Sequence, residues 1–255
     1  MSGVAELTVE VAGAPARVLH AAGEGGPVVL IHGASGCADS WRGTLGAWSG
    51  QDVWAPDLPG RGGSAGPARD RAEATAAWLG ELADVCRWRR PILVGHSYGG
   101  AVALQAALLD PDRWGGVALV ASGGRLRVSP AILAAVAEST PDAPFRLDAA
   151  FGPGTPAAVV EAYAEATRSV PPTSALADWR ACDAFDVLAR LEEVRCPTLV
   201  VYASDDALTP PKHQRAMAAR IPGAIEVALE GFGHMLPWEA PCAVARAVQA
   251  WRAGH

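Results

Sequence analysis

The chain has 255 residues, of which 50% are apolar and 19% are charged. This composition is sufficient for one large folded domain and excludes an intrinsically disordered protein. The formal net charge of −6 argues against nucleic acid or an anionic membrane as the main partner. The N-terminus lacks the pattern of a signal peptide, and no apolar run reaches the roughly 18 residues that a membrane helix needs. We therefore expect a cytoplasmic protein; its oligomeric state is not indicated.

The cysteine pattern favours free thiols. The five cysteines are odd in number and scattered, with no CxxC or Cys/His spacing of the kind that binds a metal; they are Cys37, Cys86, Cys182, Cys196 and Cys242. We predict no metal and no cofactor, and we expect Cys37 to be buried and inert rather than reactive towards thiol reagents.

The first third of the chain is rich in predicted strands. Alternating or continuous apolar runs predict strands at residues 6–11, 16–20, 27–31 and 53–56. Continuous runs such as 27–31 are typical of a sheet that is buried on both faces. A turn-rich loop follows at 57–64, and the apolar periodicity then predicts a helix over 71–87.

The remaining elements indicate a parallel sheet with one insertion. Strands are predicted at residues 91–94, 116–121, 196–203 and 224–229, and helices at 101–109, 211–220 and 241–252. Alternating strands and helices indicate an α/β fold with a mostly parallel central sheet flanked by helices. Residues 125–191 contain no strong strand and many prolines, so we predict a helical cap there. Residues 1–124 and 192–255 then form the core domain.

The segment Gly95-His96-Ser97-Tyr98-Gly99 matches the G-x-S-x-G pattern of a catalytic serine. An apolar strand precedes it and a helix follows it. Such a turn presents the hydroxyl at the C-terminal edge of the sheet, with glycines where strand and helix pass closely. We predict that Ser97 is a nucleophile.

A serine hydroxyl needs a base, and His234 is the best of the six histidines. His234 follows the last predicted strand in a glycine-rich loop, which places it at the same sheet edge as Ser97. His96 lies inside the turn, where we expect its side chain to point away from the serine. His32 ends a strand and is expected to brace a loop.

The base needs a carboxylate partner and the reaction needs an oxyanion hole. Asp205 and Asp206 both follow a buried strand, and position alone does not separate them. The oxyanion would be held by two backbone N–H groups, those of Tyr98 and of Ala34 in the glycine-rich loop after residue 31.

These segments together resemble the α/β-hydrolase fold superfamily, in its serine esterase-like branch with a helical cap. The resemblance spans nearly the whole chain. It rests on His32-Gly33, Gly95-His96-Ser97-Tyr98-Gly99-Gly100 and Gly233-His234, together with the loop 57–64, Asp206 with Pro210, and Pro237, Glu239 and Pro241. The spacing in the family selects Asp206 over Asp205. Ala203 stands where glycine is usual, and Arg61 where many relatives have histidine; we do not expect Arg61 to matter for catalysis.

The resemblance implies hydrolysis of small or medium carboxylic esters through an acyl-enzyme, with Ser97, Asp206 and His234 as the triad. A serine nucleophile argues against dehalogenase and epoxide hydrolase chemistry, which use aspartate there. The alternatives are a carbon–carbon bond hydrolase of ring-cleavage products, a cofactor-free perhydrolase and, from another class, a non-catalytic ligand receptor.

The predicted cap offers two sets of side chains for a substrate. Aromatic and apolar residues would form a wall for the ester or merely pack the cap helices: Phe145, Phe151, Tyr163, Leu176 and Trp179. The arginines would contact a carboxylate-bearing substrate, although a solvated face is the more ordinary role: Arg125, Arg127, Arg146, Arg168 and Arg180.

Overall fold

The structure is a computed structural model that describes residues 3–48 and 50–254. It is built around one eight-stranded sheet with the order β1-β2-β4-β3-β5-β6-β7-β8. The strands are β1 (Ala5–Val11), β2 (Ala14–Ala21), β3 (Glu24–Ile31), β4 (Gln51–Pro56), β5 (Ile92–His96), β6 (Gly116–Val120), β7 (Thr198–Ala203) and β8 (Ile225–Leu229). β1 and β2 pair antiparallel, β2 also pairs antiparallel with β4, and the other neighbours are parallel. The predicted fold class is confirmed.

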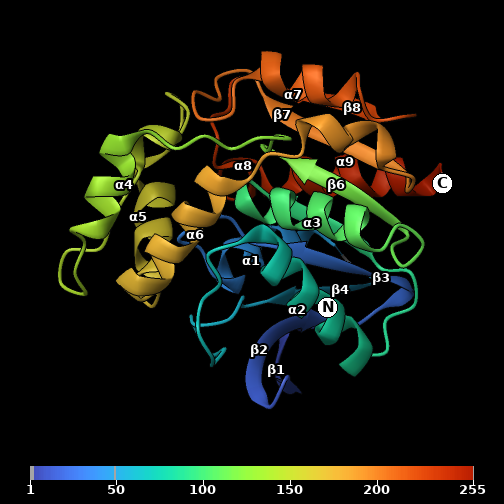
Figure 1. Cartoon of the computed structure of the whole chain (residues 1–255), viewed down its shortest axis with the longest axis horizontal. Coiled ribbons are helices and arrows are strands. Elements are labelled where there is room, and N and C mark those ends of the chain that lie inside the picture. The colour runs from blue at the N-terminus through green and yellow to red at the C-terminus, as the bar shows by residue number, and fades with distance from the viewer. Residues whose placement is uncertain (1–2, 49, 255) are drawn as a thin grey trace.

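Helices cover both faces of the sheet (Figure 1). α2 (Ala72–Val85) and α3 (Tyr98–Leu109) pack on one face, together with Met217 and Ala218 of α7 (Pro211–Ala218). The other face is covered by α1 (Arg42–Ala47) and α9 (Pro241–Ala253). All five residues of β6 are buried, as continuous apolar runs in a doubly covered parallel sheet require.

Residues between β6 and β7 form the three helices α4 (Pro130–Ala137), α5 (Ala157–Thr167) and α6 (Pro172–Ala184). In Figure 1 they lie beside the sheet, with α6 nearest to the core. A β-bridge joins Arg125 to Asp186 and brings the two ends of this segment together. We keep 125–191 as the extent of the proposed cap.

The element boundaries differ from the predicted ones mainly around turns. α3 begins at Tyr98 and not at residue 101, because the chain enters the helix directly after Ser97. Several short elements escaped the sequence patterns, among them the 3-10 turn η1 (Ala38–Trp41), the six-residue α1 and the four-residue α8 (Leu236–Glu239). They are too short to show a clear apolar period.

The parallel strands bring their C-terminal ends to one edge of the sheet. The loops that follow β3, β5 and β7 leave from this edge, and they carry Ala34, Ser97 and Asp206 respectively. The loop after β8 carries His234 and leads into α8 (Leu236–Glu239). The topology therefore gathers residues that are far apart in sequence.

Candidate active site

Ser97 occupies a strained turn between β5 and α3. Its backbone has φ 52° and ψ −115°, a region that residues with a side chain rarely adopt. The turn is tight on both sides. A Cβ at position 95 would lie 2.1 Å from the carbonyl oxygen of Gly99, and one at position 99 would lie 2.2 Å from that of Ile31. Glycine is therefore required at both positions by close backbone approach.

The ring of His234 is held by Asp206. Its Nδ1 lies 3.1 Å from Oδ1 and 3.0 Å from Oδ2 of the aspartate. The carboxylate also accepts hydrogen bonds from the backbone N–H groups of Leu208 and Thr209, at 2.9 and 2.8 Å, and from the Thr209 hydroxyl at 2.7 Å. Asp205 is exposed. The structure thus brings Asp206, and not Asp205, to the histidine.

The surroundings of Asp206 keep it charged. Burial raises its pKa, but the neighbouring His234 and the hydrogen bonds from His234 and Thr209 outweigh that effect, and the net pKa lies below its ordinary value. A carboxylate in this position stabilises an imidazolium and selects the tautomer with the proton on Nδ1. The second ring nitrogen, Nε2, is then free to accept a proton.

The backbone around His234 is fixed from three sides. Its N–H donates to the carbonyl oxygen of Ala150 at 2.8 Å, and its own carbonyl accepts from Nε2 of His96 at 2.9 Å. Glu239 accepts from the N–H groups of Gly233 and Met235, each at 2.9 Å. The loop that carries His234 is therefore held by His96 in the core, by Ala150 in the proposed cap and by Glu239 of α8.

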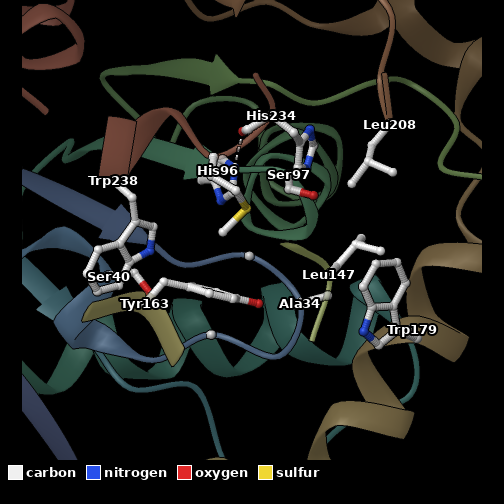
Figure 2. A pocket seen from close by; sticks show the side chains of 13 residues that line it. Ala34, Ser40, His96, Ser97, Leu147, Tyr163, Trp179, Leu208, His234 and Trp238 are labelled. Carbon is white, nitrogen blue, oxygen red and sulfur yellow. Dashed lines mark hydrogen bonds between the residues drawn. The ribbon is translucent and has the colours of Figure 1, made fainter. Parts of the chain in front are cut away.

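His96 has a positioning role that the sequence did not indicate. Its side chain lines the same pocket as Ser97, and its ring lies 5.1 Å from that of His234 (Figure 2). No hydrogen bond joins it to the serine among the described residues, which agrees with the expectation that it points away from Ser97. Burial lowers its pKa to about 3, helped by the neighbouring His234. A neutral ring that donates to a carbonyl is a structural group and not a competing base.

The predicted oxyanion donors are the backbone N–H groups of Ala34 and Tyr98. Within the described part of the chain, neither has a hydrogen-bond acceptor. Tyr98 is the first residue of α3, where N–H groups have no partner inside the helix. Ala34 lines the same pocket as Ser97. The two donors that we predicted for an oxyanion are thus both unpaired.

The loop that carries Ala34 is fastened to the cap. Ser35 has φ 56°, and its N–H donates to Oδ2 of Asp178, on α6, at 3.0 Å. The neighbouring Trp179 donates from Nε1 to the Ser35 hydroxyl at 2.9 Å. Asp178 also forms a buried ion pair with Arg61. The contacts with α6 thus stabilise a positive φ at Ser35, which is uncommon for residues other than glycine.

One narrow pocket of about 30 Å³ joins these residues (Figure 2). Backbone and small side chains from the loop after β3 form one wall, and cap and core residues close the others. The lining consists of Gly33, Ala34, Gly36, Ser40, His96, Ser97, Leu147, Tyr163, Trp179, Leu208, His234, Met235 and Trp238. Among the described residues, this lining includes no arginine, lysine, aspartate or glutamate.

The cap residues fall into different groups. Of the five predicted apolar residues, Tyr163 and Trp179 line the pocket. Phe151 packs edge-on against Tyr163, whereas Phe145 and Leu176 pack within the cap. All five arginines have exposed side chains, and three of them pair with exposed carboxylates, namely those of Asp186, Asp148 and Glu165.

Cys37, which lies near the loop that carries Ala34, is a buried structural residue. Burial raises the pKa of Cys37 to about 12, so its thiol stays protonated. All five cysteines are free.

Among the residues that the structure describes, no group of three or more metal-binding side chains is found. Over the same residues, no helix has the length and apolarity needed to cross a membrane.

Several contacts escaped the sequence reasoning. His96, Asp178 and Ser35 act through partners distant in the chain, so no local pattern marks them. The family resemblance includes Glu239, and its backbone partners in the structure give it the role of holding the loop around His234.

Comparison with known proteins identifies the fold and its relatives. Residues 28–247 match the family described as the alpha/beta hydrolase family. A thermophilic esterase from Thermogutta terrifontis has a similar structure, with a TM-score of 0.85, 27% identity and 98% of both chains covered. Est816, described as an N-acyl homoserine lactone degrading enzyme, gives a TM-score of 0.81 with 26% identity, over 96% of this chain and 99% of that one.

Curated relatives are more varied. A 2-hydroxy-6-oxo-6-phenylhexa-2,4-dienoate hydrolase from Burkholderia cepacia is 26% identical over 87% of this chain and 85% of its own length. Other relatives are much longer. The chain covers 34% of a dihydrolipoyllysine-residue acetyltransferase component from Pseudomonas putida, at 39% identity over 48% of this chain. It covers 12% of the polyketide synthase ThaQ from Burkholderia thailandensis, at 30% identity over 90% of this chain.

Proposed function

Because the chain belongs to the alpha/beta hydrolase family, we propose that it hydrolyses small, neutral carboxylic esters with Ser97, His234 and Asp206 as its catalytic triad. One observation carries the proposal. The strained serine lines the same pocket as a histidine that an ionised, fully hydrogen-bonded aspartate holds at 3.0 Å. This combination is the one that activates a serine hydroxyl.

The reaction proceeds in two halves. Ser97 Oγ attacks the ester carbonyl carbon while His234 accepts the hydroxyl proton on Nε2, and Asp206 stabilises the imidazolium. The carbonyl oxygen gains a negative charge, which the N–H groups of Ala34 and Tyr98 stabilise. The C–O bond then breaks, and His234 returns the proton to the leaving alcohol. A water molecule releases the acyl group from Ser97 by the same steps.

The pocket supports a small and neutral substrate. Its narrow space beside Ser97 favours a short acyl or alcohol part over a long one. Its lining contains no cation, and the five cap arginines are exposed. A ring-cleavage product carries a carboxylate, which would lose its hydration in this pocket without gaining a charged partner. The relative from Burkholderia cepacia nevertheless keeps carbon–carbon bond hydrolysis as the second candidate.

The proposal is tested by hydrolysis of p-nitrophenyl esters from acetate to palmitate, with Ser97→Ala as the control. We expect turnover to peak at short chains and to fall by at least about 1,000-fold in the variant. Labelling by a fluorophosphonate then distinguishes the remaining candidates. A protein that is labelled but hydrolyses no ester would be assayed next on a vinylogous diketone and for perhydrolysis. A protein that is not labelled would be a non-catalytic receptor.

A further inference from the structure

A largely buried tyrosine presents to the pocket a hydroxyl that the proposed reaction does not use. Tyr163, on α5, is 5% exposed and lines the pocket. Its hydroxyl has no hydrogen-bond partner among the residues that the structure describes. The phenol end is directed towards the part of the pocket where Ala34 lies, and away from Trp238 (Figure 2). The hydroxyl oxygen is not among the fully enclosed polar atoms that lack a partner, so it is open to the pocket and free to bind a ligand there.

The ring of Tyr163 is held in this position by other aromatic side chains. It makes edge contacts with Phe151 at 5.4 Å and with Trp238 at 5.9 Å between ring centroids. Its hydroxyl remains protonated, because burial raises the pKa of Tyr163 to about 12. The cap thus presents a fixed hydrogen-bond donor to the pocket, near the proposed oxyanion loop.

An unpaired donor in a narrow pocket discriminates between substrates. When a ligand fills the pocket and displaces water, an all-carbon chain leaves the hydroxyl unpaired, whereas an oxygen at the right place satisfies it. Because no arginine or lysine is among the described residues of the lining, the complementary group is a neutral acceptor and not a carboxylate.

We propose that the Tyr163 hydroxyl selects esters that carry a neutral oxygen acceptor, such as an ether or carbonyl oxygen, within a few bonds of the scissile carbonyl. This inference rests on the proposed ester hydrolysis and names the substrate class more closely. The acceptor belongs to either the acyl or the alcohol part, and matched substrates distinguish the two.

The test uses two pairs of esters in which one CH₂ group is replaced by oxygen. The acyl pair is p-nitrophenyl butyrate and p-nitrophenyl methoxyacetate, and the alcohol pair is butyl acetate and 2-methoxyethyl acetate. Values of kcat/KM are measured for the wild type, for Tyr163→Phe and for Tyr202→Phe. Tyr202 lies on β7 and outside the pocket lining. Tyr202→Phe therefore removes a phenol hydroxyl that does not face the substrate. Comparing variants on one substrate removes differences in intrinsic ester reactivity.

We expect Tyr163→Phe to lower kcat/KM about tenfold for the ether member of one pair and to leave its all-carbon partner nearly unchanged. The pair that responds locates the acceptor. Tyr202→Phe should change neither ratio. Equal losses on both members of each pair, or no loss on any, would overturn the inference. Failure of the proposed ester hydrolysis would give a different result. The wild type would then hydrolyse none of the four esters and would not react with a fluorophosphonate.

Discussion

The Asp178 carboxylate, on helix α6 of the cap, accepts a hydrogen bond from the backbone N–H of Ser35 at 3.0 Å. Ser35 follows Ala34, whose N–H is a proposed oxyanion donor. The same carboxylate pairs with Arg61, and both side chains are 1% exposed. Arg61, which the sequence did not mark as relevant to catalysis, therefore contacts the group that holds this loop. The proposed cap is therefore joined through α6 to the loop that would stabilise the transition state.

Removing this support should slow acylation. We expect the double variant Arg61→Leu/Asp178→Leu to lose at least about tenfold in kcat with little change in KM, because the Ala34 N–H is no longer held in position. The matched variant Arg61→Leu/Asp178→Asn keeps a side-chain oxygen for Ser35 and should retain more of kcat. Removing both charges avoids an unpaired buried ion. Stopped-flow acylation rates measure the effect, and equal rates in the two variants would argue against a positioning role.

The backbone strain at Ser97 should be visible in stability. Ser97→Gly relieves the cost of φ 52°, whereas Ser97→Ala does not. We expect the glycine variant to be more stable than the alanine variant by about 1 kcal/mol. Urea unfolding of the two inactive proteins measures the difference. A less stable glycine variant would contradict the strained geometry.

Gly99 should tolerate no side chain. A Cβ there would meet backbone atoms of Ile31 and His32 at 2.2 to 2.7 Å, so we expect Gly99→Ala to lower the free energy of unfolding by about 3 kcal/mol. The control is Gly46→Ala in α1, where nothing lies within 4 Å. Alanine favours a helix, so that variant should be unchanged or slightly more stable. Thermal unfolding compares them, and similar losses in both would refute the argument.

Two buried histidines should make stability depend on pH. Burial lowers the pKa of His32 to about 4 and that of His96 to about 3. The unfolded chain, with ordinary histidines of pKa about 6.5, binds more protons than the folded one between these values. Their contribution is therefore complete above about pH 6.5 and is lost as pH falls towards 4 and 3.

Chemical unfolding at about pH 7 and about pH 5 measures this dependence, which approaches about 1.4 kcal/mol per pH unit for each histidine. We expect His96→Gln to reduce the loss on acidification, since glutamine has no proton to gain. His213→Gln is the control, because that side chain is exposed and the loss should persist. An unaltered loss in His96→Gln would show that His96 does not contribute.

The local patterns of the sequence determined the sheet, the flanking helices and the turn that carries Ser97. Apolar runs and periodicity lie within contiguous residues, so strands such as β6 could be predicted within about a residue of their ends. The glycines around Ser97 indicated a close approach before the atoms that approach were known. The α/β topology then implied that loops after parallel strands meet at one edge.

Tertiary structure decided which residues distant in the sequence come into contact, and local sequence patterns do not encode such contacts. Position after a strand did not separate Asp205 from Asp206, and only packing brings one carboxylate to His234. Asp178 and Ser35 are 143 residues apart, and Glu239 and Gly152 are 87 apart. Such contacts depend on how the cap lies on the core, which no local period encodes. The sequence thus specified which chemistry was present, whereas long-range packing specified how its groups are aligned and which hydroxyl faces the substrate.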